Sequence, residues 1–383
     1  MNFDLPSKTQ WLVLAGSHAY GTATDTSDID VRGWCIPPKE CRSGFLNHFE
    51  QADSPSQIDR FREPIASFLN ASLPQKALDL RAGEAIDGCI FDIRKFVKLA
   101  VEANPNILDV LFSPPETHIV STDVGRRLYG HRRLFLSRRC LHTFSGYAHA
   151  QIARIERHRR WLLNPSIRRP ERADFDLPPE HPMSKDQIGA VWAKVKTRID
   201  SWEIDFGDIS EATKIHVQAQ LEKTLTDWSI SGDAGKFKAA GSLLGFETNF
   251  LAVMDKERQY KRARDEWDHY KTWECDRNPA RAELERKYGF DVKHGAHLVR
   301  LLQSCREILT TGDYSVRRPN RDELLGIRNG AWSYDRLMVW ATQEERELHA
   351  VAKVSPLPHG PDRVLIDSIL CEIVDASDRE SVK

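Results

Sequence analysis

Two carboxylates separated by a single residue, Asp28 and Asp30, are the first side chains in this sequence that could do chemistry. They lie in the sequence Ser-Asp-Ile-Asp-Val-Arg at residues 27–32, which alternates between apolar and polar positions. This alternation predicts a strand with Asp28, Asp30 and Arg32 on one face. Side chains two apart on a strand lie roughly 7 Å apart at Cα, so both carboxylates can reach the same ion. Because oxygen ligands favour Mg²⁺ or Mn²⁺ over zinc, the spacing predicts a site for one of these cations.

A glycine and a serine, Gly16 and Ser17, precede the two carboxylates and follow an apolar run at residues 11–15. The apolar run predicts a buried strand, and the Gly-Ser turn lets backbone N–H groups approach a phosphate. A short helix starting at residue 18 or 19 would add the unpaired N–H groups of its first turn. A phosphate site beside a divalent-cation site is the arrangement used in phosphoryl and nucleotidyl transfer.

A third carboxylate is needed from a neighbouring strand if two cations are to be held. Residues 84–91 predict that strand, and Asp87 lies near its start. Asp92 is the alternative, but it also suits the N-cap of a helix predicted over residues 93–103. We therefore assign the third carboxylate to Asp87 and keep Asp92 as the rival.

These motifs together resemble the signature of the DNA polymerase β-like nucleotidyltransferase superfamily. The signature is an apolar strand, a Gly-Ser turn and, about eleven residues later, Ser-Asp-x-Asp. Residues 87–96 and 103–114 resemble the segment after the catalytic core in the predicted nucleotidyltransferases found beside RNA ligases. Residues 287–302 resemble the C-terminal signature of that narrower family. The resemblance covers roughly residues 10–160 and 262–374.

The resemblance implies metal-dependent transfer of an NMP from an NTP to a hydroxyl acceptor, an RNA end or other nucleic acid, with release of pyrophosphate. It implies Mg²⁺ or Mn²⁺ as cofactor, ATP or another NTP as substrate, and a role in RNA repair in association with an RNA ligase. The implied metal ligands and catalytic residues are Asp28, Asp30 and Asp87. The implied nucleotide-binding residues are Gly16, Ser17, Arg32, Lys293, His297 and Arg300. On a helix, the last three lie within about 60° of one another, opposite an apolar stripe.

Three other functions are compatible with parts of this pattern. A relative of antitoxin-type enzymes would transfer AMP to a protein hydroxyl instead of a nucleic acid. A regulator that binds nucleotide or RNA without catalysis would also retain the fold, although intact carboxylates disfavour it. Some glycosyltransferases use an Asp-x-Asp metal motif, but the strand and Gly-Ser turn before it do not suit a nucleotide-sugar fold. The sequence does not choose the NTP or the acceptor.

The composition narrows the class of protein. Fifty-five Lys and Arg residues balance 56 Asp and Glu residues, so any nucleic-acid site must be local. The seven cysteines form no C-x-x-C pair, which argues against a disulfide framework or a zinc ribbon and fits a reducing cytoplasm. No apolar run approaches eighteen residues. We therefore expect a cytoplasmic protein with no membrane partner.

The predicted fold class is α/β in the broad sense (α+β), with a small mixed β-sheet nucleotidyltransferase core, flanking helices and a mostly helical C-terminal half folding back over the site. The expected domains are a catalytic core at 1–120, a helical region at 121–250 with an insertion at 164–250, and a C-terminal helical domain at 251–374. A flexible tail is expected at 375–383. Residues 39–75 predict a long loop with one edge strand, and residues 164–182 a linker. Helices are expected over 184–199 and 210–228.

Overall fold

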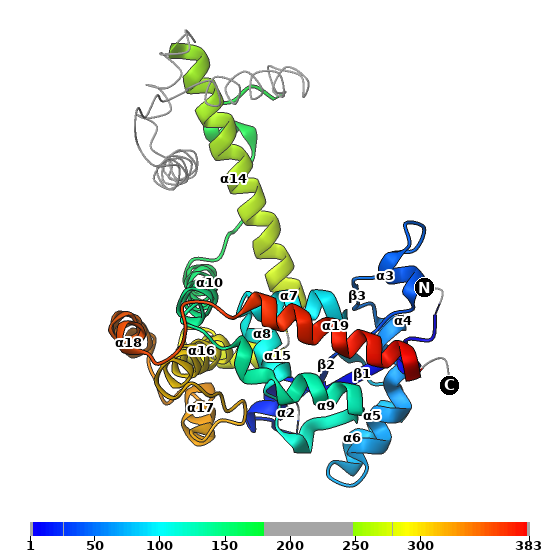
Figure 1. Cartoon of the computed structure of the whole chain (residues 1–383). Helices are drawn as coiled ribbons and strands as arrows, with labels where there is room; N and C mark the ends of the chain where they lie inside the picture. The colour runs from blue at the N-terminus through cyan, green and yellow to red at the C-terminus, as the bar shows by residue number, and fades with distance from the viewer. Residues whose placement is uncertain (1–2, 26, 180–247, 278, 381–383) are drawn as a thin grey trace, which may run out of the picture. The chain divides into compact units, whose positions relative to one another are not determined.

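The computed structural model describes residues 3–25, 27–179, 248–277 and 279–380, and it divides the chain into two compact units (Figure 1). The first unit joins residues 1–163 to residues 279–383, and the second consists of residues 164–278. The helices expected over 184–199 and 210–228 lie outside the described residues. Within the described residues, no helix is long and apolar enough to cross a membrane.

A five-stranded mixed sheet forms the centre of the first unit, in the order β3-β4-β2-β1-β5. The β2 and β4 strands run parallel, and the other three neighbouring pairs are antiparallel. This confirms the predicted small mixed sheet with flanking helices. The strands are β1 (Thr9–Leu14), β2 (Ile29–Cys35), β3 (Gln51–Ala52), β4 (Ile86–Asp92) and β5 (His118–Ser121).

Both faces of the sheet are covered, because β1, β2 and β4 each contribute buried apolar residues to a core on either side. Leu12 and Leu14 of β1 belong to one core, while Trp11 and Val13 belong to the other. The first core is completed by the short helices α1 (Leu5–Lys8), α4 (Pro55–Ile58), α5 (Arg62–Leu69) and α6 (Pro74–Arg81). The second is completed by α7 (Ile93–Val101), α8 (Pro105–Leu111), α9 (Asp123–Gly130) and the C-terminal helices.

The remaining chain of the first unit is mostly helical, as predicted. In Figure 1, α10, α16, α17 and α18 group beside one another, and α16 packs against each of the other three. The terminal helix continues to Glu380, past residue 375 where the sequence predicts a flexible tail. These helices are α10 (Cys140–Leu163), α15 (Pro279–Tyr288), α16 (Val292–Thr311), α17 (Arg321–Arg328), α18 (Tyr334–Val354) and α19 (Arg363–Glu380).

The prediction of a long loop over residues 39–75 is wrong, because this segment is largely helical. It contains α3 (Lys39–Ser43), the edge strand β3 that was expected, α4, a 3₁₀ turn at Asp59–Phe61, and α5. Ile58, Phe61, Ile65 and Leu69 are buried at helical spacing against the sheet. Helices of only four to eight residues carry too few turns for this periodicity to stand out in the sequence.

The described part of the second unit consists of a 3₁₀ turn at Arg172–Phe175 and the long helix α14 (Thr248–Asp276). Arg172 forms an ion pair with Glu257, and the rings of Phe175 and Tyr260 meet edge to face with centroids 5.7 Å apart. Part of the predicted linker is therefore packed on a helix. The expected C-terminal domain begins at residue 251, whereas α14 groups with residues 164–247.

Candidate active site

The glycine at the start of α2 (Gly16–Tyr20) approaches Asp30 more closely than any other residue type could. Gly16 has a φ of 58°, and a Cβ placed on it would lie 2.8 Å from Asp30 Oδ2. The N–H of Ala15 donates to the backbone carbonyl of Asp30 at 2.7 Å, which ties the two segments together. No side chain caps the N-terminus of α2. The predicted Gly-Ser turn thus becomes the first turn of a short helix beside the second strand.

The strand register brings the predicted carboxylates together. Asp30 on β2 is the direct neighbour of Asp87 on β4, and adjacent strands lie roughly 4.8 Å apart. Asp28 lies immediately before β2, and all three side chains line the same cavity. The rival, Asp92, lies at the other end of β4, where it is buried and caps α7 by accepting the N–H of Arg94 at 2.7 Å. This arrangement supports Asp87 over Asp92 as the third carboxylate.

The negative charge of the carboxylates is poorly neutralised by the protein. Arg32 contacts Asp30 at 3.4 Å, and within the described part of the chain Asp28 and Asp87 form no ion pair. Burial raises the pKa of Asp30, as do Asp87 and Asp28, while Arg32 and Lys293 oppose the rise. Three converging carboxylates with little cationic compensation fit a hard divalent cation, which prefers oxygen ligands.

The cavity beside these carboxylates has a volume of about 590 Å³ and lies wholly within the first unit. Its walls come from α2, the ends of β2 and β4, α8, α16 and α17. Every residue that the sequence assigns to the site lines it: Gly16, Ser17, Asp28, Asp30, Arg32, Asp87, Lys293, His297 and Arg300. The C-terminal half therefore does cover the N-terminal site, through α16.

The helical stripe suggests that Arg300 lies on a solvated face, but the side chain is buried. It is 2% exposed, donates to Asp109 at 3.3 Å, and its guanidinium lies 3.8 Å from the ring centroid of Tyr20. A cation paired to a buried carboxylate has little charge left for a substrate phosphate. The predicted role of Arg300 in neutralising phosphate charge is therefore revised below.

His297 is likewise unsuited to carry charge. Burial lowers its pKa well below the ordinary value, and the neighbouring Arg300 lowers it further. One N–H of Arg300 points at His297 Nδ1 at 3.2 Å. The imidazole is neutral at physiological pH. Lys293, one turn earlier on α16, is exposed and faces the carboxylates closely enough to affect the pKa of Asp30.

Among the cavity residues that the sequence-based assignment leaves out, Arg328 and Asp109 bear most on the charge of the site. Arg328, at the end of α17, donates to the carbonyl of Thr22 at 2.9 Å, and burial lowers its pKa. It forms no ion pair within the described residues, so its charge faces the cavity unbalanced. Asp109 lies within residues 103–114, to which the sequence assigns only a family resemblance. Its position in an otherwise apolar helix is a signal, because a buried carboxylate needs a partner.

A second group of possible metal ligands lies near this wall of the cavity. Among the described residues, the ligand atoms of His158, Asp291 and His294 lie within 4.8 Å of one another. Asp291 already caps α16 and is bonded by the guanidinium of Arg281. Burial lowers the pKa of His294 to about 4, with a contribution from Arg281. The guanidinium of Arg281 already occupies the carboxylate of Asp291 and would repel a metal ion there. This group is therefore better explained as an ion-paired helix cap.

The N-terminal part of the chain, which contains the candidate carboxylates, matches a known protein family. Residues 5–163 match the RNA repair pathway DNA polymerase beta family. The match confirms the resemblance to DNA polymerase β-like nucleotidyltransferases associated with RNA repair, and it contains all of the candidate carboxylates. It covers less than half of the 383 residues and stops before α16. The resemblance of residues 262–374 to the same family stays a prediction.

One curated relative matches part of the chain. An uncharacterized 38.9 kDa protein in the nrdC-mobD intergenic region of Enterobacteria phage T4 is 26% identical over 141 residues. The match spans 36% of this chain and 36% of the phage protein, so about a third of the relative's length is covered. No solved structure matches the chain.

Proposed function

We propose that the protein is a metal-dependent nucleotidyltransferase that transfers an NMP from an NTP to a hydroxyl of an RNA end or other nucleic acid and releases pyrophosphate. The observation that carries the proposal is the register pair of Asp30 and Asp87 beside Gly16. It converges with the match to a family named for RNA repair. A functional association with an RNA ligase would follow from that role.

The roles of the residues follow from their positions. Asp28, Asp30 and Asp87 would hold Mg²⁺ or Mn²⁺. Bound there, such cations lower the pKa of an attacking hydroxyl and offset charge on the phosphates. Gly16 leaves room for Asp30, and the N–H groups of the uncapped α2, with the hydroxyl of Ser17, offer donors to phosphate oxygens.

Positive charge for the phosphates comes from the opposite wall. The ammonium of Lys293 on α16 and the guanidinium of Arg328 on α17 both line the cavity, and neither is paired with a carboxylate in the part of the chain described. Arg32 already contacts Asp30, so it orients that carboxylate as well as facing the cavity. In the reaction, the acceptor oxygen bonds to the α-phosphorus, and the bond from that phosphorus to the bridging oxygen of pyrophosphate breaks.

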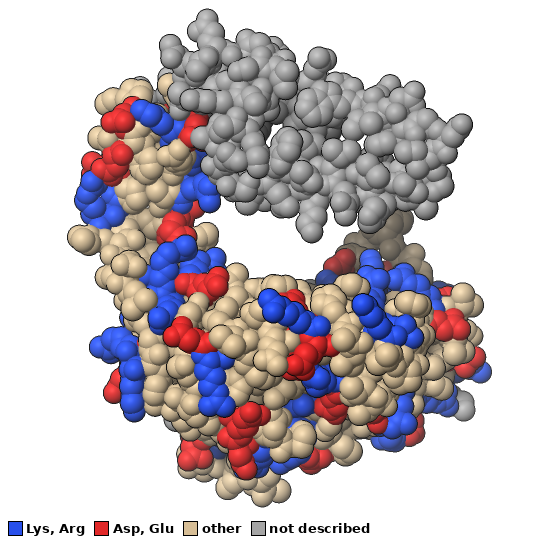
Figure 2. Space-filling view, turned by 90° about the vertical axis from the view of Figure 1, so that its left-hand side faces the viewer, with Lys and Arg blue, Asp and Glu red and all other residues tan. Residues whose placement is uncertain are grey.

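The charge on the surface agrees with a local site. On the face shown in Figure 2, Lys and Arg side chains are interspersed with Asp and Glu side chains. That face offers an acidic acceptor no broad positive field.

The test is incubation of the full chain with each of the four α-³²P-labelled NTPs and Mg²⁺ or Mn²⁺, with and without total RNA. Label on RNA, lost in Asp30→Asn and with EDTA, is the expected result. Asp123→Asn is the matched control, because Asp123 is an exposed residue at the start of α9 outside the cavity. Label on protein would favour the AMP-transferring alternative, and nucleotide binding without any label would favour the inactive regulator.

A further inference from the structure

The buried end of the cavity contains a hydrogen-bonded chain that joins three distant segments. Asp109 on α8 accepts hydrogen bonds from the hydroxyls of Tyr20 (2.6 Å) and Tyr314, and from Arg300. Arg300 reaches onward from Asp109 to His297 Nδ1. Asp109, Tyr314 and Arg300 are each less than a tenth exposed. The chain of contacts thus runs from a fully bonded carboxylate, through a guanidinium, to an imidazole at the cavity wall.

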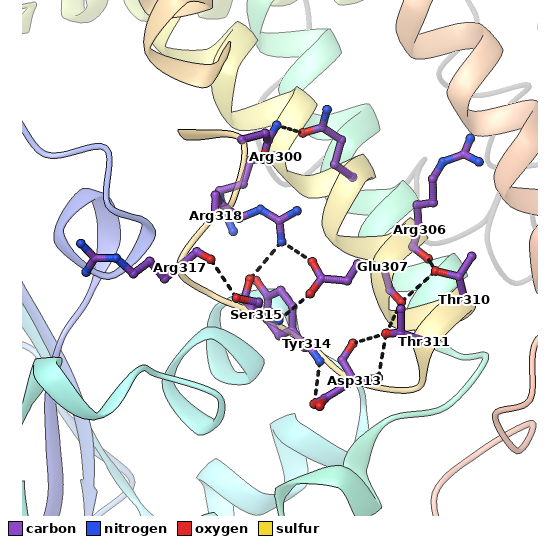
Figure 3. Close-up of polar contacts among 12 residues, drawn as sticks. Arg300, Arg306, Glu307, Thr310, Thr311, Asp313, Tyr314, Ser315, Arg317 and Arg318 are labelled. Carbon is purple, nitrogen blue, oxygen red and sulfur yellow. Dashed lines mark hydrogen bonds and ion pairs between the residues drawn. The ribbon is translucent and has the colours of Figure 1, made fainter. Parts of the chain in front are cut away.

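The surroundings hold this chain rigidly. Figure 3 shows the loop after α16, where Glu307 on the helix accepts hydrogen bonds from the N–H of Ser315 (2.8 Å) and from Arg318 (2.6 Å). The N–H of Arg318 also donates to the carbonyl of Tyr20 at 3.1 Å. The loop that carries Tyr314 is therefore tied both to α16 and to α2.

The chemistry of a guanidinium decides the state of His297. Arginine has only hydrogen-bond donors, so Nδ1 of His297, which faces Arg300, must accept and therefore carries no proton. The proton of the neutral imidazole is then on Nε2, and His297 lines the cavity. The charged or titratable groups that influence it are all cationic or neutral: Arg300, His294 and Lys293 on α16, and Arg154 on α10.

We propose that His297 donates a hydrogen bond from Nε2–H to a phosphate oxygen of the bound NTP, and that Arg300 and Asp109 are positioning residues that hold its imidazole neutral and in this tautomer. This inference rests on the proposed function for its ligand. Lys293 precedes His297 by one helical turn on the same wall, so an NTP whose phosphates meet Lys293 passes next to His297. The imidazole would contribute a directional hydrogen bond, and Lys293 would contribute positive charge.

The state of His297 is measured without any nucleotide. Long-range ¹H–¹⁵N spectra of the full chain labelled with ¹⁵N-histidine report the tautomer of each of its 14 histidines. The signals of His297 are those lost in His297→Gln. We expect the Nε2–H tautomer at pH 7 and a pKa well below the ordinary value, because burial and the neighbouring Arg300 both lower it. An Nδ1–H tautomer, or a charged ring at pH 7, would overturn the proposal.

The positioning role is tested by removing both charges at once. Asp109→Asn with Arg300→Gln leaves polar groups for Tyr20 and Tyr314, so the fold has the best chance of survival. The pKa of His297 should then rise, because the contribution of Arg300 is removed, while burial still holds it below the ordinary value. The control is Arg306→Gln with Glu344→Gln, a bidentate pair at 2.6 and 2.8 Å that joins α16 to α18 outside the cavity. The same tautomer and pKa of His297 in the test variant as in the wild type, or an equal change in the control variant, would contradict the role assigned to Arg300.

The ligand is tested by equilibrium binding of the four α,β-methylene NTP analogues with Mg²⁺. His297→Leu should weaken the tightest of them about tenfold, whereas His297→Gln, whose amide N–H can take the place of Nε2–H, should stay within about threefold. Equal affinity in His297→Leu and the wild type would refute the donor role. If no analogue binds the wild type, the proposed function fails together with the ligand assignment, and the spectra still decide the positioning part separately.

Discussion

Replacement of Gly16 by alanine tests the site through its tightest contact. The new Cβ would lie 2.8 Å from Asp30 Oδ2, and the two atoms would have to separate by about 0.6 Å to reach ordinary contact at 3.4 Å. Asp30 cannot yield freely, because its backbone accepts from Ala15 and its strand pairs on both sides. The carboxylate must therefore turn away from its place beside Asp87.

We expect two separable effects from Gly16→Ala. The positive φ costs an alanine about 1–2 kcal/mol of stability. Misplacement of a reacting group by up to 1 Å costs on the order of 100-fold in rate, so we expect a 10- to 100-fold fall in label transfer and a parallel loss of Mn²⁺ affinity. Thermal unfolding measures the first effect, and the transfer assay with electron paramagnetic resonance of bound Mn²⁺ measures the second.

Gly312→Ala separates the two effects. Gly312 ends α16 with a φ of 68°, and its added Cβ would meet only Leu357 at 3.6 Å, an ordinary contact. It should lose a similar amount of stability and keep both Mn²⁺ binding and transfer. Wild-type Mn²⁺ affinity and transfer in Gly16→Ala would refute the argument that this glycine makes room for Asp30.

Three further predictions concern the walls of the cavity. Asp87→Asn should abolish transfer and largely spare NTP binding. Asp92→Asn, which weakens the pair with Arg94, should lower the melting temperature without lowering transfer by the folded protein. Reversed phenotypes would mean that the third carboxylate was misassigned. Lys293→Ala should raise the KM for NTP or, if it contacts RNA instead, lower RNA affinity and its salt dependence; no change in either would mark it as a solvated residue. Arg328→Gln should weaken NTP binding tenfold or more, and Arg328→Lys much less, because a charged hydrogen bond contributes about 1.5–3 kcal/mol. Titration calorimetry measures both affinities, and wild-type affinity in both variants would exclude Arg328 from the site.

The positions of the three candidate carboxylates were predictable because local patterns determine where they lie. Alternation along residues 27–32 puts Asp30 on the face opposite Ile29 and Val31, and those two residues are fully buried in one core. The third carboxylate needed one more step, the parallel pairing of two strands. Asp87 near the start of its strand has the same relation to the cavity as Asp30, whereas Asp92 at the end is used as a helix cap.

The state of the residues on α16 was not predictable from periodicity. Helical spacing correctly puts Lys293, His297 and Arg300 at one wall, yet it treats them as three equivalent cations. What distinguishes them is Asp109, which lies 191 positions from Arg300 in the sequence. Pairing with Asp109 uses the charge of Arg300, and burial together with Arg300 lowers the pKa of His297. Such long-range partners determine protonation, and a single sequence does not reveal them.

The end of the family match at residue 163 does not mark the end of the structural unit that the site requires. Phe144 and Ile155 on α10 lie in the same core as Leu298 and Leu302 on α16, and all four are almost completely buried. The carboxylates come from the matching segment, but Lys293, the cation that faces them from α16, comes from beyond it. A segment that ended at residue 163 would expose the face of α10 that α16 covers and would leave the cavity without that wall. The candidate carboxylates and their C-terminal cover therefore belong to one compact unit, and residues 164–278 form the other.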